Sequence, residues 1–166
     1  MNFNKEQLEA VYSEKPLVVV SAGAGSGKTR VLTERFVYLC EQRFKHGVLG
    51  IGASVQEIVA ITFTEKAARE MKERIRKRIR EKANEAQEHK EKQYWAEQIE
   101  AVDQANISTF HSFCQRLLSQ YAMLAQLPPT LTILDESKSR QLTRETLLQL
   151  IREVGFVERL SRFFAI

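Results

Sequence analysis

The feature that most constrains this chain is a glycine-rich octapeptide between an apolar run and a helical pattern. The octapeptide is Ala22-Gly23-Ala24-Gly25-Ser26-Gly27-Lys28-Thr29, the run before it is Leu17-Val18-Val19-Val20, and an amphipathic pattern extends from residue 29 to about 43. A buried strand, a turn of glycines and a helix in this order are the context of a phosphate-binding loop. The order predicts an α/β fold with a strand at 17–20 in a parallel sheet.

Each residue type in this loop suits a polyphosphate. Glycines let consecutive backbone N–H groups curve around an anion, and the start of the helix adds partial positive charge. Lys28 supplies a full charge for the β and γ phosphates, and the Thr29 hydroxyl is an oxygen ligand of the kind Mg²⁺ prefers. The usual pattern begins with glycine, whereas this chain has Ala22. The loop predicts nucleotide binding; the alternative is a glycine-rich turn that binds nothing.

A glutamine lies ahead of the loop, within a predicted helix at 4–12. The Gln7 carboxamide has one acceptor and two donors, which match the N6/N7 edge of adenine. Taken alone, a glutamine at this position is better interpreted as an exposed helix residue.

Strand and helix patterns alternate over most of the remaining chain. The predicted elements are a strand at 58–61, a long charged helical insert at about 65–102 with Thr64 as N-cap, a strand at 107–110, a helix from 111 to about 125, and a helix at 137–154 that Gly155 ends. Leu127-Pro128-Pro129 marks the boundary between two domains, 1–126 and 127–166. This alternation indicates an α/β parallel sheet followed by a helical appendage.

Positive charge is concentrated in one segment. The chain carries a formal net charge of +4, but between Lys66 and Lys82 there are nine basic residues against three acidic ones. Such a block attracts polyphosphate backbones in a salt-dependent way. The alternative is the solvated face of a long helix.

Composition indicates a cytoplasmic protein without a membrane partner. No stretch approaches the ~20 apolar residues of a membrane span, and residues 1–7 lack a signal-peptide pattern. Cys40 and Cys114 are isolated thiols without metal-ligand spacing, which excludes a zinc knuckle and a disulfide framework.

Four blocks together resemble the UvrD/Rep-type superfamily 1 DNA helicases, and most closely the AddA/RecB-like helicase subunits of recombination nucleases. The blocks are the Gln7 segment, residues 22–32, residues 61–71 and residues 108–113, and they stand in the family's order and spacing. The long charged insert at roughly 80–102 fits the recombination-nuclease branch better than the repair helicases.

The resemblance implies a RecA-like P-loop NTPase sheet, partial lobe 1A, over residues 1–126 and the start of helical subdomain 1B over 127–166. It implies ATP and Mg²⁺ as cofactors, Lys28 and Thr29 as catalytic residues, and Thr29 as the Mg²⁺ ligand. The implied ATP-binding residues are Gln7, Ala22, Gly23, Ala24, Gly25, Ser26, Gly27, Lys28, Thr29 and Arg30, with Gln7 reading adenine and Arg30 lying against the base.

The implied DNA contacts are Thr62, Phe63, Thr64, Lys66, Thr109, Phe110, His111 and Ser112. Sheet core is the alternative for Phe63 and Phe110, and a helix start without ligand contact for His111. The implied partners are single- or double-stranded DNA, the remainder of the helicase chain and a nuclease subunit.

The acids that ATP hydrolysis requires have one lookalike in the chain. Residues 131–136 end in Asp135-Glu136, which we expect to cap the following helix rather than to act in catalysis. A motor of two lobes does not fit in 166 residues. We therefore expect an N-terminal piece of a helicase that binds ATP weakly and hydrolyses it negligibly. There are two alternatives. One is a small P-loop kinase in which the arginines of 74–80 form the lid, and the other is a non-catalytic interaction module.

Overall fold

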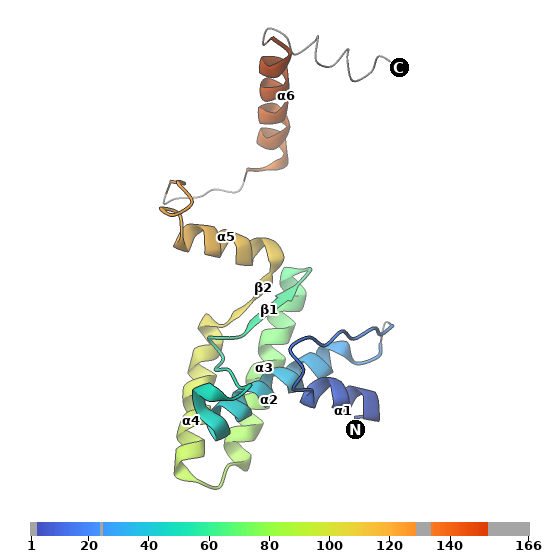
Figure 1. Cartoon of the computed structure of the whole chain (residues 1–166), viewed down its shortest axis with the longest axis vertical. Helices are drawn as coiled ribbons and strands as arrows, with labels where there is room; N and C mark the ends of the chain where they lie inside the picture. Colours follow the sequence, from blue (N-terminus) through green and yellow to red (C-terminus); the bar gives the residue numbers. More distant parts are fainter. Residues whose placement is uncertain (1–2, 24, 129–133, 153–166) are drawn as a thin grey trace. The chain divides into compact units, whose positions relative to one another are not determined.

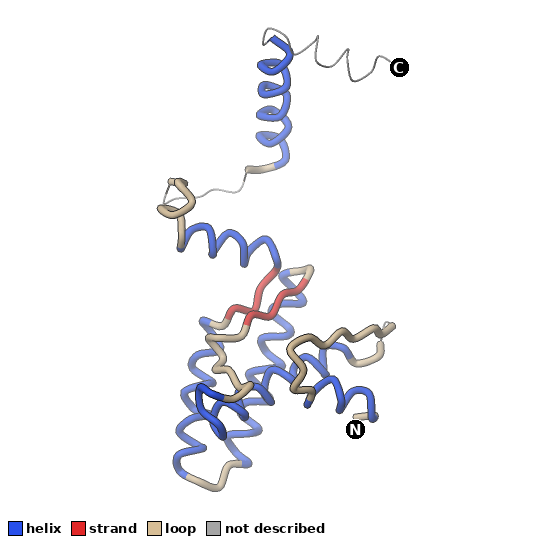
Figure 2. The backbone as a smooth tube through the Cα atoms, in the orientation of Figure 1, coloured by secondary structure: helices blue, strands red, loops and turns tan. Residues whose placement is uncertain are grey.

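A computed structural model describes residues 3–23, 25–128 and 134–152 of the chain. The chain divides into two compact units, residues 1–117 and 118–166. Figure 1 labels the elements in chain order, and Figure 2 shows that the first unit is mostly helical around two short strands.

The first two helices pack around a small apolar cluster. Helix α1 is Lys5–Tyr12 and helix α2 is Lys28–His46, and Ala10 and Val11 pack against Val31 between them. Arg35 fixes the end of α1, because its Nη1 donates hydrogen bonds to the carbonyls of Val11 at 2.9 Å and Ser13 at 2.8 Å. The last carbonyls of a helix have no partner within the helix, so these bonds satisfy them.

The loop that follows α2 contains a glycine that is sterically required. It contains the short helix η1, Gly47–Leu49, and then folds back onto the end of α2. The Ala53 N–H donates to the Leu39 carbonyl at 3.0 Å. A Cβ at Gly52 would lie 2.0 Å from the Arg43 nitrogen, so only glycine permits this close approach of two backbones.

Two parallel strands form the sheet. Strand β1 is Val59–Thr62 and strand β2 is Asn106–Thr109, in a register that pairs Val59 with Asn106 and Thr62 with Thr109. Both lie within one residue of their predicted positions. Helix α3, Glu65–Glu85, helix α4, His89–Ala101, and the short helix η2, Val102–Gln104, connect them. The insert predicted at 65–102 is thus two helices side by side rather than one (Figure 1).

The main core lies among α2, α3, α4 and β2. Met71, Ile75 and Ile79 form a buried stripe along α3, and Trp95 of α4 is fully buried against them. Each such side chain contributes about 1.5–3 kcal/mol through its burial. Thr64 caps α3 as predicted, since its hydroxyl oxygen accepts a hydrogen bond from the Ala67 N–H at 3.1 Å.

The structure corrects the prediction of a strand at 17–20. Among the described residues the sheet contains β1 and β2 alone, and residues 17–20 pair with neither. Leu17 is 76% exposed and Val19 is 83% exposed. A strand is stabilised only by a neighbouring strand and a covered face, and this apolar run has neither in the described residues. The fold is therefore helix-rich α/β with a two-stranded parallel sheet.

Helix α5, Phe110–Gln120, runs across the division between the two units, and helix α6, Glu136–Arg152, lies in the second. Asp135 caps α6 as expected, because its Oδ1 accepts a hydrogen bond from the Lys138 N–H at 2.8 Å. The predicted stop at Gly155 lies outside the described residues, and the domain boundary at 126/127 stays a prediction. None of the described helices is both long and apolar enough to cross a membrane.

Candidate functional site

The glycine-rich loop leads directly into α2. Gly25 and Gly27 have φ of +77° and +83°, the left-handed region that glycine adopts without strain. Gly27 is the N-cap of α2 and has no side chain with which to cap the helix. The first amides of α2, those of Lys28 and Thr29, therefore remain for an anion together with the positive end of the helix dipole.

Lys28 points back over the loop. Its Nζ donates hydrogen bonds to the carbonyls of Ala22 at 2.7 Å and Gly23 at 2.6 Å. The Ser26 hydroxyl donates to the same Gly23 carbonyl at 2.8 Å. Ala24 lies outside the described residues. The ammonium group is thus placed against the curve of the loop, where it can balance negative charge on a bound group.

Gln7 contacts the loop from α1. Its Nε2 donates to the Ser26 carbonyl at 3.0 Å, and its Oε1 accepts from the Asn4 N–H at 3.0 Å, completing a capping box. A Cβ at Gly27 would lie 3.3 Å from the Gln7 Nε2, so the glycine admits the carboxamide. A cavity of about 110 Å³ is lined by these elements, with Gln7, Ser26 and Lys28 among its residues.

Thr29 and Arg30 complete the predicted set at the start of α2. The Thr29 carbonyl accepts a hydrogen bond from the Thr33 hydroxyl at 2.9 Å. This bond uses the backbone oxygen of Thr29 and not its hydroxyl group. The Arg30 guanidinium lies 4.1 Å from the centre of the Phe3 ring. Such stacking on an aromatic face is favourable for a planar cation. The structure therefore brings Gln7, the loop, Lys28 and Thr29 together, with Arg30 beside them.

A second group of predicted residues lies where the two strands end. Because β1 and β2 are parallel and Thr62 pairs with Thr109, their carboxyl ends meet at one edge of the sheet. Phe63 is fully exposed and Phe110 is largely exposed, so neither belongs to the sheet core. Phe110 contacts His111 edge to face, with ring centres 6.3 Å apart. Exposed aromatic faces and hydroxyls at one edge suit a nucleic-acid backbone and its bases.

Glu65 ties the two strand ends together, and sequence reasoning missed it. Its Oε1 accepts hydrogen bonds from the hydroxyls of Thr109 at 2.9 Å and Ser112 at 2.8 Å. The bond from Ser112, followed by that from Thr109, lowers the pKa of Glu65 below its ordinary value. An acidic residue is common in the first turn of a helix, because its negative charge interacts favourably with the positive end of the helix dipole. The sequence therefore contains no distinct signal that Glu65 connects the two strand ends.

The chain is similar to parts of much longer proteins. The family model described as UvrD/REP helicase N-terminal domain matches residues 3–159. The A subunit of the ATP-dependent helicase/nuclease of Ligilactobacillus salivarius is 35% identical over 161 residues, which are 97% of this chain and 12% of that protein. The proteins of the same name from Enterococcus faecalis and Streptococcus sanguinis are 33% and 40% identical, over 98% and 82% of this chain and 12% and 10% of their own lengths. The chain therefore spans only about a tenth of these relatives.

Proposed function

The chain belongs to the UvrD/REP helicase N-terminal domain family, and from this premise we propose that it is the ATP-binding N-terminal part of an ATP-dependent DNA helicase that acts with a nuclease. The resemblance to AddA/RecB-like helicase subunits is thereby confirmed. The observation that carries the proposal is the convergence of Gln7 and Lys28 on one glycine loop at the start of α2.

Adenine recognition by Gln7 is consistent with the bonds that it makes. The carboxamide uses one hydrogen for the Ser26 carbonyl and one lone pair for the Asn4 N–H. One N–H and one lone pair remain, the pair that the N7 and N6 groups of adenine require. We propose that Gln7 reads the base while it holds α1 against the loop, and that the Arg30 guanidinium lies against that base.

The triphosphate is proposed to lie on the amides of the loop and of the first turn of α2. The residues fit it: positive φ at Gly25 and Gly27 curves the backbone, and a Cβ at Gly23 or Gly25 would meet no atom within 4 Å. Lys28 exchanges its carbonyl bonds for phosphate oxygens. Thr29 would hold Mg²⁺, which supplies charge neutralisation between the phosphates.

DNA is proposed to follow the edge formed by the strand ends. Phe63 and Phe110 offer stacking faces, and Thr62, Thr64, Lys66 and His111 stand beside them. The hydroxyl hydrogens of Thr109 and Ser112 are donated to Glu65 or shared between the two hydroxyls, so these oxygens act as acceptors or through water. Contacts of this kind hold a backbone without reading its sequence.

Hydrolysis and unwinding are proposed for the full-length protein. The proposed partners are the remainder of the helicase chain and a nuclease subunit, and a RecA-like sheet would be completed by strands outside the described residues. We expect negligible ATP hydrolysis by the 166 residues alone. Membership of a helicase family does not favour the kinase or the interaction module.

The experiment is a thermal and calorimetric titration of the 166-residue chain with Mg-ATP. Binding at ten times the dissociation constant stabilises the folded chain by about 1.4 kcal/mol. Lys28→Ala should abolish the shift in Tm that Mg-ATP causes, while the free variant still unfolds in one cooperative transition with the helix content of the wild type. Lys90→Ala, an exposed lysine on α4, is the matched control and should keep the full shift. A wild-type chain that shows no heat and no shift at millimolar Mg-ATP contradicts the proposal.

A further inference from the structure

The structure separates the basic block at 66–82 into two sets with different roles. Four of its nine cations are held by other parts of the fold: Lys72, Arg76, Arg78 and Lys82. Lys72 donates to the Asp103 carbonyl at 2.6 Å, and Arg76 pairs with the Asp103 carboxylate. These contacts attach α3 to η2, and they account for two of the four.

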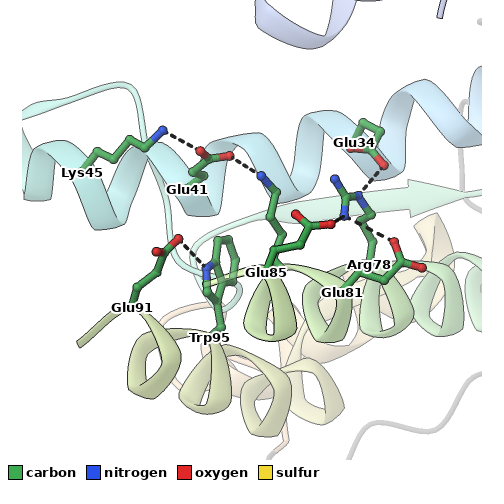
Figure 3. Close-up of polar contacts among 9 residues, drawn as sticks. Glu34, Glu41, Lys45, Arg78, Glu81, Glu85, Glu91 and Trp95 are labelled. Atoms are coloured by element: carbon green, nitrogen blue, oxygen red, sulfur yellow. Dashed lines mark hydrogen bonds and ion pairs between the residues drawn. The ribbon is translucent and has the colours of Figure 1, made fainter. Parts of the chain in front are cut away.

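The other two attach α3 to α2 (Figure 3). The Arg78 Nε donates to Glu34 at 2.8 Å, and the Lys82 Nζ donates to Glu41 at 3.0 Å. Glu41 also accepts from Lys45 at 2.5 Å, and burial would raise its pKa, but the two lysines outweigh burial and lower it. These four cations therefore serve the packing of the helices.

The remaining five cations have no such partners. Within the described part of the chain, none of them forms an ion pair or a side-chain hydrogen bond, and all are exposed: Lys66, Arg69, Arg74, Lys77 and Arg80. At 3.6 residues per turn, Lys66, Arg69, Lys77 and Arg80 fall within an arc of about 80° on the side opposite the buried stripe. We call these five residues the α3 basic face.

The acids of the same helix make no ion pair with the α3 basic face, although Arg69 lies close enough to Glu65 to help lower the pKa of that carboxyl group. Glu70 to Arg74 and Glu73 to Lys77 have the spacing of favourable ion pairs, yet neither pair is made in the described structure. Glu73 pairs instead with Arg76 at 2.7 Å, and Glu81 with Arg78 at 3.3 Å. Two of the three acids of the block thus pair with the structural arginines Arg76 and Arg78 and not with the exposed cations, although Glu73 itself lies between Arg80 and Lys66 around the helix.

We propose that the α3 basic face binds the sugar-phosphate backbone of duplex DNA that adjoins the strand-end site. The proposal rests on the proposed function. From Lys66, two residues after the Thr64 cap, to Arg80 the helix rises about 21 Å at 1.5 Å per residue, which matches about six base pairs of duplex at 3.4 Å per step.

The composition of the face favours a duplex over other polyanions. Every exposed residue of α3 is charged or polar, and none is aromatic. A single strand is held by stacking on aromatic side chains, and a protein partner by buried aromatic or apolar anchors. Duplex binding through phosphates requires cations alone.

The test compares two fluorescent DNAs in anisotropy titrations at several low salt concentrations. One is a short single strand, and the other carries the same strand as a tail on a twelve-base-pair duplex. Lys77→Gln with Arg80→Gln should lower the slope of log K against log salt for the tailed duplex by about 1.8, since each lost phosphate contact lowers it by about 0.9. Affinity for the single strand should not change.

Lys90→Gln with Lys92→Gln is the control, because it removes the same charge from exposed positions on α4. It should leave both DNAs bound as by the wild type. The α3 proposal is overturned if the α3 variant weakens binding of both DNAs equally, if the control weakens binding as much as the α3 variant does, or if the α3 variant changes nothing. In each of these cases the proposed function still stands. A wild-type chain that binds neither DNA overturns both. Lys66→Gln, beside the strand ends, should weaken both DNAs and serves as the positive comparison.

Discussion

The two halves of the first unit are held together in different ways. Around α3 and α4 the fold is closed by apolar burial, with Trp95, Ile75 and Ile79 fully inaccessible. Around the glycine loop the apolar cluster is small, the run at 17–20 is exposed, and hydrogen bonds from Gln7, Lys28 and Arg35 hold the segments in place. A closed core stabilises the molecule, whereas the polar half keeps its groups available for a ligand.

The largest expected effect is on the closed half. Trp95→Ala removes a fully buried side chain and should lower the free energy of unfolding by about 3–5 kcal/mol, measured by urea denaturation. Leu17→Ala, in the exposed run, should change it by less than about 0.5 kcal/mol. If the two substitutions cost the same, the apolar run is covered in solution and the contrast between the halves fails.

An intermediate effect is expected at the joint between α1 and α2. Arg35→Gln loses the Nη1 group that donates to the carbonyls of Val11 and Ser13, and should lower the free energy of unfolding by about 1.5–3 kcal/mol. The loss should be local, since amide hydrogens of α1 should exchange faster while those of α3 and α4 keep their protection. Because α1 carries Gln7, the stabilisation by Mg-ATP should shrink as well. Uniformly faster exchange in all helices would show that the halves unfold as one.

The smallest expected effect concerns pH. Two lysines lower the pKa of Glu41 in the folded chain, although burial opposes them. The stability that this shift contributes is present above the ordinary glutamate pKa of 4.5 and is lost as the pH falls through the lowered folded value. Glu41→Gln should therefore lose stability at neutral pH and show a flatter fall below pH 4.5. If the free energy of unfolding of the variant fell with pH as steeply as that of the wild type below pH 4.5, Glu41 would be excluded as a source of this acid sensitivity.

Local patterns predicted a large part of this molecule. The glycine turn, the Thr64 cap and the Asp135 cap depend on residues within a few positions of one another, and the structure has them where the sequence predicts them. The two strands were predicted from local apolar runs, and each finds the other as its partner. The strand at 17–20 was wrong because pairing depends on a neighbour distant in the chain. The break between α3 and α4 carries no glycine or proline, so no local signal marks it.

The roles of single charged residues were the least predictable. Glu65 acquires its role only when Thr109 of β2 and Ser112 of α5, 44 and 47 positions away, come into hydrogen-bond distance. The basic block was correctly located, but its division depends on Glu34, Glu41 and Asp103, which meet α3 only in the folded chain. Charge counts along a sequence give the sum of such contacts and not their distribution.

The position of Trp95 also determines which structural changes intrinsic tryptophan fluorescence can detect in this protein. It is the only tryptophan, it is shielded from water on all sides, and its indole N–H is bonded to Glu91 at 3.3 Å. Its emission should therefore be that of an apolar environment and shift to the red only when the pair of helices opens. Intrinsic fluorescence should therefore follow the unfolding of the half around α3 and α4. It should not change when a ligand binds to the half that contains the glycine loop.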